Sequence, residues 1–185
     1  MERRHFLQAG GLTLSAATIA LLGGKEALAS KLKANEKGDV AILNIALALE
    51  NEAIAAYQLG AESKLLNADI LKTAVLFQSH HKEHSDALAA TIKKLGGTPV
   101  VAKTLAEYAK DLNAATLKNQ EDILILAAKH EKGAANAYLG VIPSFTDKEI
   151  AKVGARIAAD EVMHWTILAT VLKQELPAHS LFFGA

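Results

Sequence analysis

Apolar residues recur at intervals of three and four positions over four long stretches of the chain. The stretches span about residues 39–60, 68–95, 119–139 and 146–175. This period places the apolar side chains on one face of a helix, so the pattern predicts four long amphipathic helices. Gly96, Gly97 and Pro99 end the second stretch. We expect Asp39 to cap the first helix.

The fourth helix is expected to begin at Thr146, with Glu149 three residues on as the partner of a capping box. More than twenty residues separate the second and third stretches, and one short amphipathic helix is expected within them, around residues 102–112. Runs of β-branched residues and two-residue alternation are nearly absent, so no sheet is expected. The predicted fold is all-α, a four-helix bundle of two helical hairpins joined by a long crossover connection.

Ionisable residues interrupt the apolar face of each predicted helix near its middle. A carboxylate and an imidazole three positions apart lie on the same helix face and can bind one metal ion together. One such pair has little weight, because it occurs often by chance. Here all four helices contribute, through Glu50, His81, His84, Glu131, Glu161 and His164.

An internal repeat relates these residues to one another. The first and third helices each carry a Glu followed seven positions later by a Tyr, and the second and fourth each carry an ionisable residue three positions before a His. The two copies are Glu50/Tyr57 with His81/His84, and Glu131/Tyr138 with Glu161/His164, offset by 81 and 80 residues. Each half therefore places ionisable groups at the same height in the bundle, where the six residues are expected to converge.

Three carboxylates buried without a nearby positive charge would cost several kcal/mol each. Two divalent cations would remove that penalty, and we predict a metal centre on this ground. The alternative is a polar core of His–Glu ion pairs, or side chains that reach water. Oxygen and imidazole ligands suit iron or manganese, and zinc and copper stay open. The chain has no Cys, which excludes disulfides, thiolate metal sites and iron–sulfur clusters.

The histidines and the acid next to the predicted ligands are given other roles. Glu83 lies off the apolar face of its helix and is not expected to bind metal. His80 and His130 are also off that face and are expected to be solvated. Asp160 either orients a ligating His as a hydrogen-bond acceptor or is simply exposed.

The aromatic residues near the predicted centre are assigned mainly to packing. Tyr57 and Tyr138 lie on the apolar face and are expected in the core; the alternative is a hydroxyl bonded to a ligand carboxylate, or a redox-active Tyr. Trp165 is expected to pack between helices. The apolar tail, residues 177–185, suits either a homodimer or partner contact, or a cover over the end of the bundle.

The first 29 residues read as an export signal rather than as part of the fold. Arg3 and Arg4 precede Phe6, an apolar run from about Leu12 to Leu22 follows, and Ala27-Leu28-Ala29 is a small-x-small cleavage signal. The paired arginines resemble the twin-arginine class. The expected organisation is signal peptide 1–29, polar spacer 30–38, helical bundle 39–176 and tail 177–185, in a periplasmic or secreted protein that is exported after folding.

Charge argues against several classes of partner. Without residues 1–29, which hold three basic and two acidic residues of the 20 of each, the chain has 17 basic and 18 acidic residues. No basic excess points to nucleic acid or to an anionic membrane surface. The apolar run of the signal is too short for a comfortable membrane span, and no membrane span is expected in the mature chain.

Over about residues 39–175 the chain resembles the ferritin-like superfamily of dinuclear carboxylate proteins. More narrowly, it resembles the secreted ferritin-like domain family that includes desiccation-related proteins. The narrower resemblance rests on LNIALALE (43–50), LGGTPV (95–100), AYLG (137–140) and ADEVMH (159–164). It implies a four-helix bundle with a dinuclear centre held by the six residues above.

The second helix departs from the superfamily pattern, which usually has Glu-x-x-His where this chain has His81-Lys82-Glu83-His84. Three carboxylates offset less of the charge of two divalent ions than four would. This favours a lower resting oxidation state, an added hydroxide or carboxylate, or occupancy of a single site.

Three functions are consistent with such a chain. The first is an oxidoreductase (peroxidase, catalase-like or oxidase) in which two iron or manganese ions react with dioxygen or peroxide. The second is metal binding or sequestration without catalysis. The third is a structural, stress- or desiccation-related bundle. The sequence identifies neither a substrate nor an electron partner.

Overall fold

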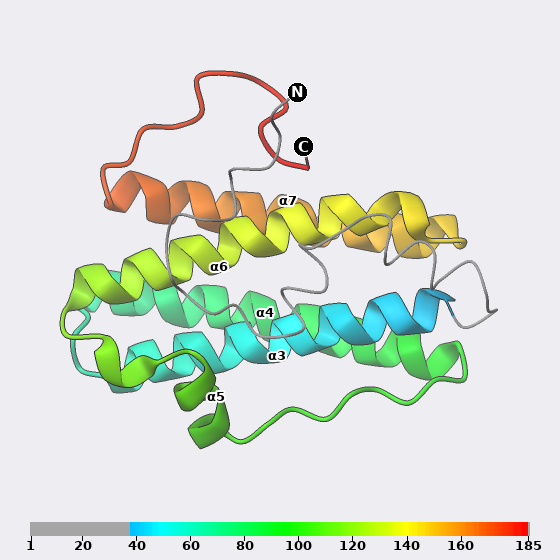
Figure 1. Cartoon of the computed structure of the whole chain (residues 1–185), viewed down its shortest axis with the longest axis horizontal. Helices are drawn as coiled ribbons and strands as arrows, with labels where there is room; N and C mark the ends of the chain where they lie inside the picture. Colours follow the sequence, from blue (N-terminus) through cyan, green and yellow to red (C-terminus); the bar gives the residue numbers. More distant parts are fainter. Residues whose placement is uncertain (1–37, 185) are drawn as a thin grey trace, which may run out of the picture.

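In the computed structural model, which describes residues 38–184, four long helices lie side by side (Figure 1). They are α3 (Gly38–Glu62), α4 (Ala68–Lys94), α6 (Gln120–Val141) and α7 (Lys148–Val171). α3 packs along α4, and α6 packs along α7. No strand occurs in residues 38–184. The all-α bundle of two helical hairpins expected from the sequence is confirmed. The predicted signal peptide and most of the spacer lie outside the described residues.

The connection between the hairpins contains the expected short helix. α5 (Leu105–Asp111) is followed by a 3₁₀ turn, η1 (Ala114–Thr116), and Figure 1 shows both beside α3. Thr104 and Glu107 form a full capping box at the start of α5. Tyr108 and Leu112 pack on Ala55 of α3, which attaches the connection to the first hairpin.

α4 ends in a turn that requires glycine. Backbone N–H groups of Gly96 and Gly97 donate to the carbonyls of Lys93 and Ile92, at 3.0 and 2.9 Å. Gly96 has φ of 75°, a left-handed conformation that costs Gly least. A Cβ on Gly97 would lie 2.5 Å from Val40 of α3, so this turn also holds the two helices close.

Two of the expected helix starts are corrected by the structure. The N-cap of α7 is Asp147, whose carboxylate accepts the N–H of Glu149 at 2.7 Å, and no Thr146–Glu149 capping box forms. Asp39 lies inside the first turn of α3. Its carboxylate accepts the N–H groups of Thr146 and Asp147, at 2.9 and 3.1 Å, and so ties α3 to the start of α7. A short 3₁₀ turn, η2 (Ile142–Ser144), separates α6 from α7.

Two apolar clusters fill the bundle on either side of its middle. One is built around Leu43, Leu88 and Ile157, and the other around Phe77 and Leu168. The apolar faces of the helices are buried over most of their length, but Leu95 and Val171, at the ends of α4 and α7, are exposed. The zone between the two clusters has the low effective dielectric constant of a protein interior, so charges interact strongly there.

The tail after α7 folds back over the bundle (Figure 1). The ring of Phe183 meets Trp165 edge-on at 5.1 Å, and the N–H of Gly184 donates to the side chain of Asn136 at 2.8 Å. The tail thus packs along α6 and α7 of its own bundle, rather than over the end of the bundle as expected, while Leu181 stays 90 % exposed. Trp165 is buried, as expected.

One described helix, α3, has the length and composition of a membrane span. More than half of that stretch is buried inside the bundle. Burial against other helices is the behaviour of a core helix in a folded domain.

Candidate metal centre

The six ionisable residues expected to converge do so at mid-bundle. Each long helix contributes at least one of them, and none of the six residues is more than 8 % exposed. The apolar residues three and four positions away pack the helices together and so direct these side chains inward. The six are Glu50 on α3, His81 and His84 on α4, Glu131 on α6, and Glu161 and His164 on α7.

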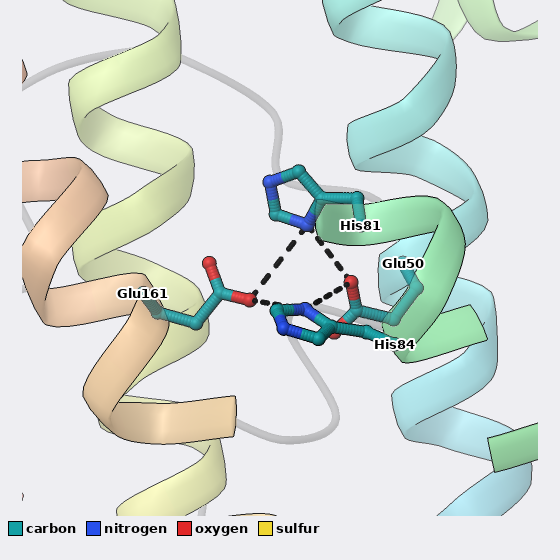
Figure 2. Close-up of side chains that lie close together, drawn as sticks. All are labelled: Glu50, His81, His84 and Glu161. Carbon is teal, nitrogen blue, oxygen red and sulfur yellow. Dashed lines mark hydrogen bonds and ion pairs between the residues drawn. The ribbon is translucent and has the colours of Figure 1, made fainter. Parts of the chain in front are cut away.

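One group of four side chains joins the first hairpin to α7 (Figure 2). Oε2 of Glu50 lies 2.8 Å from Nδ1 of His81 and 3.4 Å from Nδ1 of His84. Oε1 of Glu161 reaches across from α7 to 3.3 Å from Nδ1 of His84. These four residues offer ligand atoms that all lie within 4.8 Å of one another.

A second group of four overlaps the first and faces α6. It contains His81, Glu131, Glu161 and His164, again with ligand atoms within 4.8 Å of one another. Nε2 of His81 lies 3.2 Å from Oε1 of Glu131, and Nδ1 of His164 lies 3.3 Å from Oε2 of Glu131. His81 and Glu161 belong to both groups, so the six residues form one continuous cluster.

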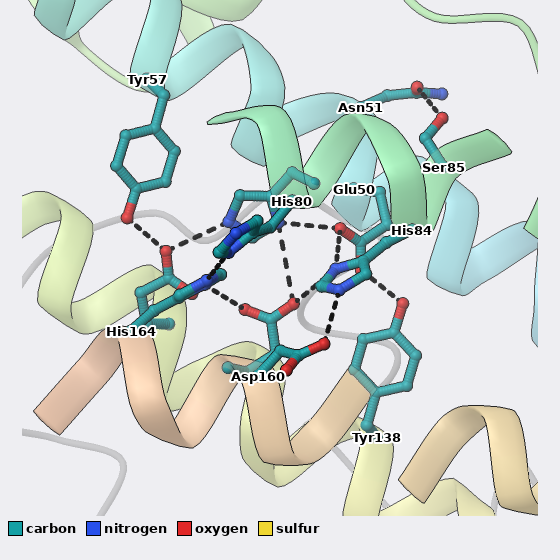
Figure 3. A network of polar contacts seen from close by, with 12 residues as sticks. Glu50, Asn51, Tyr57, His80, His84, Ser85, Tyr138, Asp160 and His164 are labelled. Atoms are coloured by element: carbon teal, nitrogen blue, oxygen red, sulfur yellow. Dashed lines mark hydrogen bonds and ion pairs between the residues drawn. The ribbon is translucent and has the colours of Figure 1, made fainter. Parts of the chain in front are cut away.

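Two tyrosines close the cluster from opposite sides (Figure 3). The hydroxyl of Tyr138 donates to Oε1 of Glu50 at 2.5 Å, and that of Tyr57 donates to Oε1 of Glu131. Burial and the nearby carboxylates raise the pKa of both tyrosines well above 10. Both stay protonated donors at neutral pH. The core position expected for them is confirmed, together with the alternative of a bond to a carboxylate of the cluster.

His80 contacts the cluster, which differs from the expectation that it is solvated. Nδ1 of His80 lies 2.9 Å from Nε2 of His164, and the two rings stack. A hydrogen donated from Nε2 of His164 to His80 leaves Nδ1 of His164 free to bind metal. Asp160 combines its two expected roles: its side chain is 49 % exposed, and its Oδ2 lies 3.2 Å from Nε2 of His84. Glu83 is exposed and outside both groups.

A further buried pair, Glu52 and His130, was not expected. Nε2 of His130 lies 3.5 Å from Oε1 of Glu52, with side chains 14 % and 4 % exposed. His130 also lines a cavity of about 20 Å³ next to Glu50 and His81, which has room for one water. The prediction of a solvated His130 is wrong, because the residue lies between α3 and α6.

The donor set fits divalent metal ions. Both carboxylate oxygens of Glu161 and Nδ1 of His84 are buried without a hydrogen-bond partner of acceptable geometry. Buried polar atoms rarely stay unpaired, and each costs about 1–3 kcal/mol when they do. A cation among three carboxylates and three imidazoles would satisfy these atoms and use only ligands that iron and manganese accept.

The pKa values of these residues indicate that protons offset the negative charge of the carboxylates when no cation is bound. Burial opposes ionisation of Glu50, but hydrogen bonds and charge from His81 and His84 lower its pKa to about 2. Burial also opposes the charge on His84, yet Glu161 and Glu50 raise its pKa to about 10. Burial and the Glu131 charge raise the pKa of Glu161 to about 7. The site therefore holds protons that a metal ion would displace.

A mostly apolar crevice leads to one side of the cluster. It contains a cavity of about 40 Å³ and is lined by residues that include Tyr57, Phe77, Ala127, Ile167 and Val171. Ile167 and Val171 are partly exposed, whereas Phe77 is buried and stacks on the ring of His164 at 4.1 Å. The crevice thus runs from near the surface to the side chains that contact Glu131 and His164.

Known proteins resemble this chain in sequence and in fold. Residues 38–174 match the sequence model of the ferritin-like domain. A comparison with curated proteins found no match. Among solved structures, the crystal structure of a conserved hypothetical protein from Mycobacterium tuberculosis is similar, with a TM-score of 0.63 and 18 % identity. The similarity covers 86 % of this chain and 99 % of that chain, and at this identity it supports the fold alone.

Proposed function

The chain belongs to the ferritin-like domain family, and we propose that it is an exported metalloprotein with a dinuclear iron or manganese centre. The observation that carries the proposal is the pair of overlapping four-residue groups, with buried carboxylate and imidazole atoms that lack hydrogen-bond partners. The ligands would be Glu50, His81, His84, Glu131, Glu161 and His164. Zinc and copper use the same donors and are the competing ions.

Bound iron or manganese would supply the electrons that reduce a small oxidant. The surrounding residues support such a role. Tyr57 and Tyr138 hold the two outer carboxylates in place by hydrogen bonds, and the two apolar clusters exclude bulk water. A dry, rigid site keeps electrostatic interactions strong and limits side reactions.

The crevice favours dioxygen over peroxide as the oxidant. Its lining is almost entirely apolar, and dioxygen is an apolar molecule that enters such a space without losing hydrogen bonds. Hydrogen peroxide would have to shed its hydrogen bonds with water, at a cost of about 1–3 kcal/mol for each buried polar group left unpaired. An oxidase-type reaction is therefore the more specific form of the proposal.

A structural metal is the second candidate. It is favoured by one observation: the six residues come from all four long helices, so an ion among them would hold both hairpins together whether or not it reacts. Metal sequestration without catalysis belongs to the same class. Loss of the ion would then lower thermal stability and change nothing else.

The deciding experiment is a single-turnover reaction. Iron- or manganese-loaded protein, reduced under anaerobic conditions, is mixed with dioxygen and in a separate run with hydrogen peroxide. Stoichiometric oxidation of the metal by dioxygen, absent in a His81→Ala, Glu161→Ala variant, supports the oxidoreductase. Loaded protein that keeps its metal reduced with both oxidants supports the structural role.

Export rests on Arg3, Arg4 and the Ala27-Leu28-Ala29 signal alone. The twin-arginine route carries folded proteins, so the metal could be inserted before export. Cell fractionation with N-terminal sequencing of the mature chain tests this. We expect a chain that begins at Ser30 outside the cytoplasm, and retention of a full-length Arg3→Lys, Arg4→Lys variant inside it.

A further inference from the structure

The ring of His81 lies between the two four-residue groups and presents one nitrogen to each. Its Nδ1 is 2.8 Å from Oε2 of Glu50 and 3.7 Å from Oε1 of Glu161. Its Nε2, on the opposite side of the ring, is 3.2 Å from Oε1 of Glu131. Nδ1 therefore faces carboxylates of α3 and α7, whereas Nε2 faces the carboxylate of α6.

The other shared residue, Glu161, is divided in the same way. Its Oε1 lies 3.3 Å from Nδ1 of His84, in the group that contains Glu50. Its Oε2 lies 3.6 Å from Nδ1 of His164, in the group that contains Glu131. His81 can thus offer a different nitrogen to each group, and Glu161 a different oxygen. No single atom has to be a ligand in both groups.

We propose that His81 bridges the two metal ions, with Nδ1 bound to the ion beside Glu50 and Nε2 bound to the ion beside Glu131. Glu161 forms the second bridge through its two oxygens. The inference rests on the proposed dinuclear centre, since a bridge needs two ions. Coordination at both nitrogens leaves the ring without an N–H, and the protons displaced from both nitrogens pass to water.

The surroundings of His81 hold the ring in this orientation. The residue is 1 % exposed, its ring stacks on Tyr57 with centroids 5.4 Å apart, and it meets the ring of His84 edge-on at 5.8 Å. A side chain packed on two faces cannot turn away without disturbing its neighbours. The ring is therefore positioned for both groups before any ion arrives.

A bridging imidazole spaces the ions more widely than a carboxylate does. Two metal–nitrogen bonds of about 2 Å on opposite sides of the ring give a separation of about 6 Å. Ions in two-metal sites commonly lie about 3.5–4 Å apart, whereas Glu161, which gives a different oxygen to each ion, can span the wider distance that the ring sets. The ions should therefore be weakly coupled, and the separation is a property that can be measured without any activity assay.

The test is X-ray absorption spectroscopy on manganese- and iron-loaded protein, with metal content measured on the same samples. The wild type should bind two equivalents and show no metal–metal vector at 3.5–4 Å. The matched variant His81→Glu replaces the ring by a carboxylate that can bridge more closely. It should keep two equivalents and gain that vector.

A second variant separates bridging from simple ligation. His81→Gln retains one ligand atom but has no second ring nitrogen, so it should lose one equivalent of metal. A wild-type protein with two equivalents and a vector at 3.5–4 Å overturns the bridge and leaves the dinuclear centre standing. A wild type that binds no stoichiometric metal overturns both.

Discussion

Tyr138 on α6 donates a 2.5 Å hydrogen bond to Glu50 on α3, 88 positions earlier in the chain. Its counterpart in the repeat, Tyr57 on α3, donates to Glu131 on α6. Each hairpin thus supplies the tyrosine that fixes a carboxylate of the other. The internal repeat of the sequence is expressed in the structure as a reciprocal contact between the hairpins.

Tyr138→Phe should weaken metal binding while the bundle stays folded. The change removes a hydrogen bond to a charged acceptor, worth about 1.5–3 kcal/mol, without altering the ring that packs in the core. We expect Tyr57→Phe to behave alike. Tyr108→Phe, on α5 and away from the metal centre, is the matched control and should leave metal affinity unchanged. Equal metal affinity in all three variants, measured by competition with a chelator, would contradict the role of these hydroxyls.

Glu161→Gln should have opposite effects on metal binding and on stability. It removes a carboxylate that belongs to both groups, so metal content should fall sharply. The same carboxylate is buried without hydrogen bonds. Its neutral replacement should therefore stabilise the metal-free protein, by about 1–3 kcal/mol at pH 8. Urea unfolding of metal-free samples tests this, with the exposed Glu83→Gln as control; a destabilised variant would contradict it.

The metal-free protein should lose stability as pH rises above about 6.5. Glu50 has its pKa lowered to about 2, so its contribution is lost as pH falls from 4.5 to 2. The pKa of Glu161 is raised to about 7 and that of His84 to about 10. In the folded state Glu161 keeps its proton between pH 4.5 and 7 and His84 keeps its proton between pH 6.5 and 10, so the stability that these two groups contribute falls as pH rises. The lowered pKa values of His80 and His130 act in the opposite sense below pH 6.5, so the net fall is expected above that pH.

Metal should reverse this trend on the alkaline side. Metal ions compete with protons for the same atoms, so the loaded protein should gain stability between pH 5 and 8 relative to the metal-free protein. Thermal unfolding of both forms at a series of pH values measures the difference. A metal-free protein whose melting temperature rises from pH 6.5 to 8 would contradict the proton-filled site.

Ala127→Leu should slow the reaction with dioxygen without changing metal content. Ala127 lines the crevice, and a larger side chain would fill most of its cavity of about 40 Å³. The exposed Ala87→Leu on α4 is the control. Stopped-flow mixing of reduced, loaded protein with dioxygen gives the rates, and identical rates in wild type and Ala127→Leu would rule out this route.

Much of the fold could be predicted from the sequence because helix periodicity and glycine turns act locally. The predicted start of α7 is one residue too early, because Thr146 and Asp147 are both good caps and the backbone N–H of Thr146 binds Asp39, 107 positions away. That contact depends on how the hairpins assemble. Periodicity along one helix carries no information about it.

The same periodicity predicts the residues of the candidate site that lie on the main apolar face of each helix. It does not predict the contacts of residues that lie off that face. Residues on the main apolar face converged as expected, because that face points to the bundle axis. His80 and His130 lie off it and were assigned to solvent. In the bundle, His80 meets His164 between α4 and α7, and His130 meets Glu52 between α3 and α6. These side faces are defined only by which helices become neighbours.

Metal content tests the central claim most directly. The protein is exported by its own signal, purified without added metal and measured by mass spectrometry, beside a His81→Ala, Glu161→Ala variant and a Glu83→Ala control. We predict about two equivalents of iron or manganese in the wild type and the control, and loss of the metal in the double variant. No stoichiometric metal in the wild type would contradict the dinuclear centre and leave a bundle whose polar core is balanced by protons.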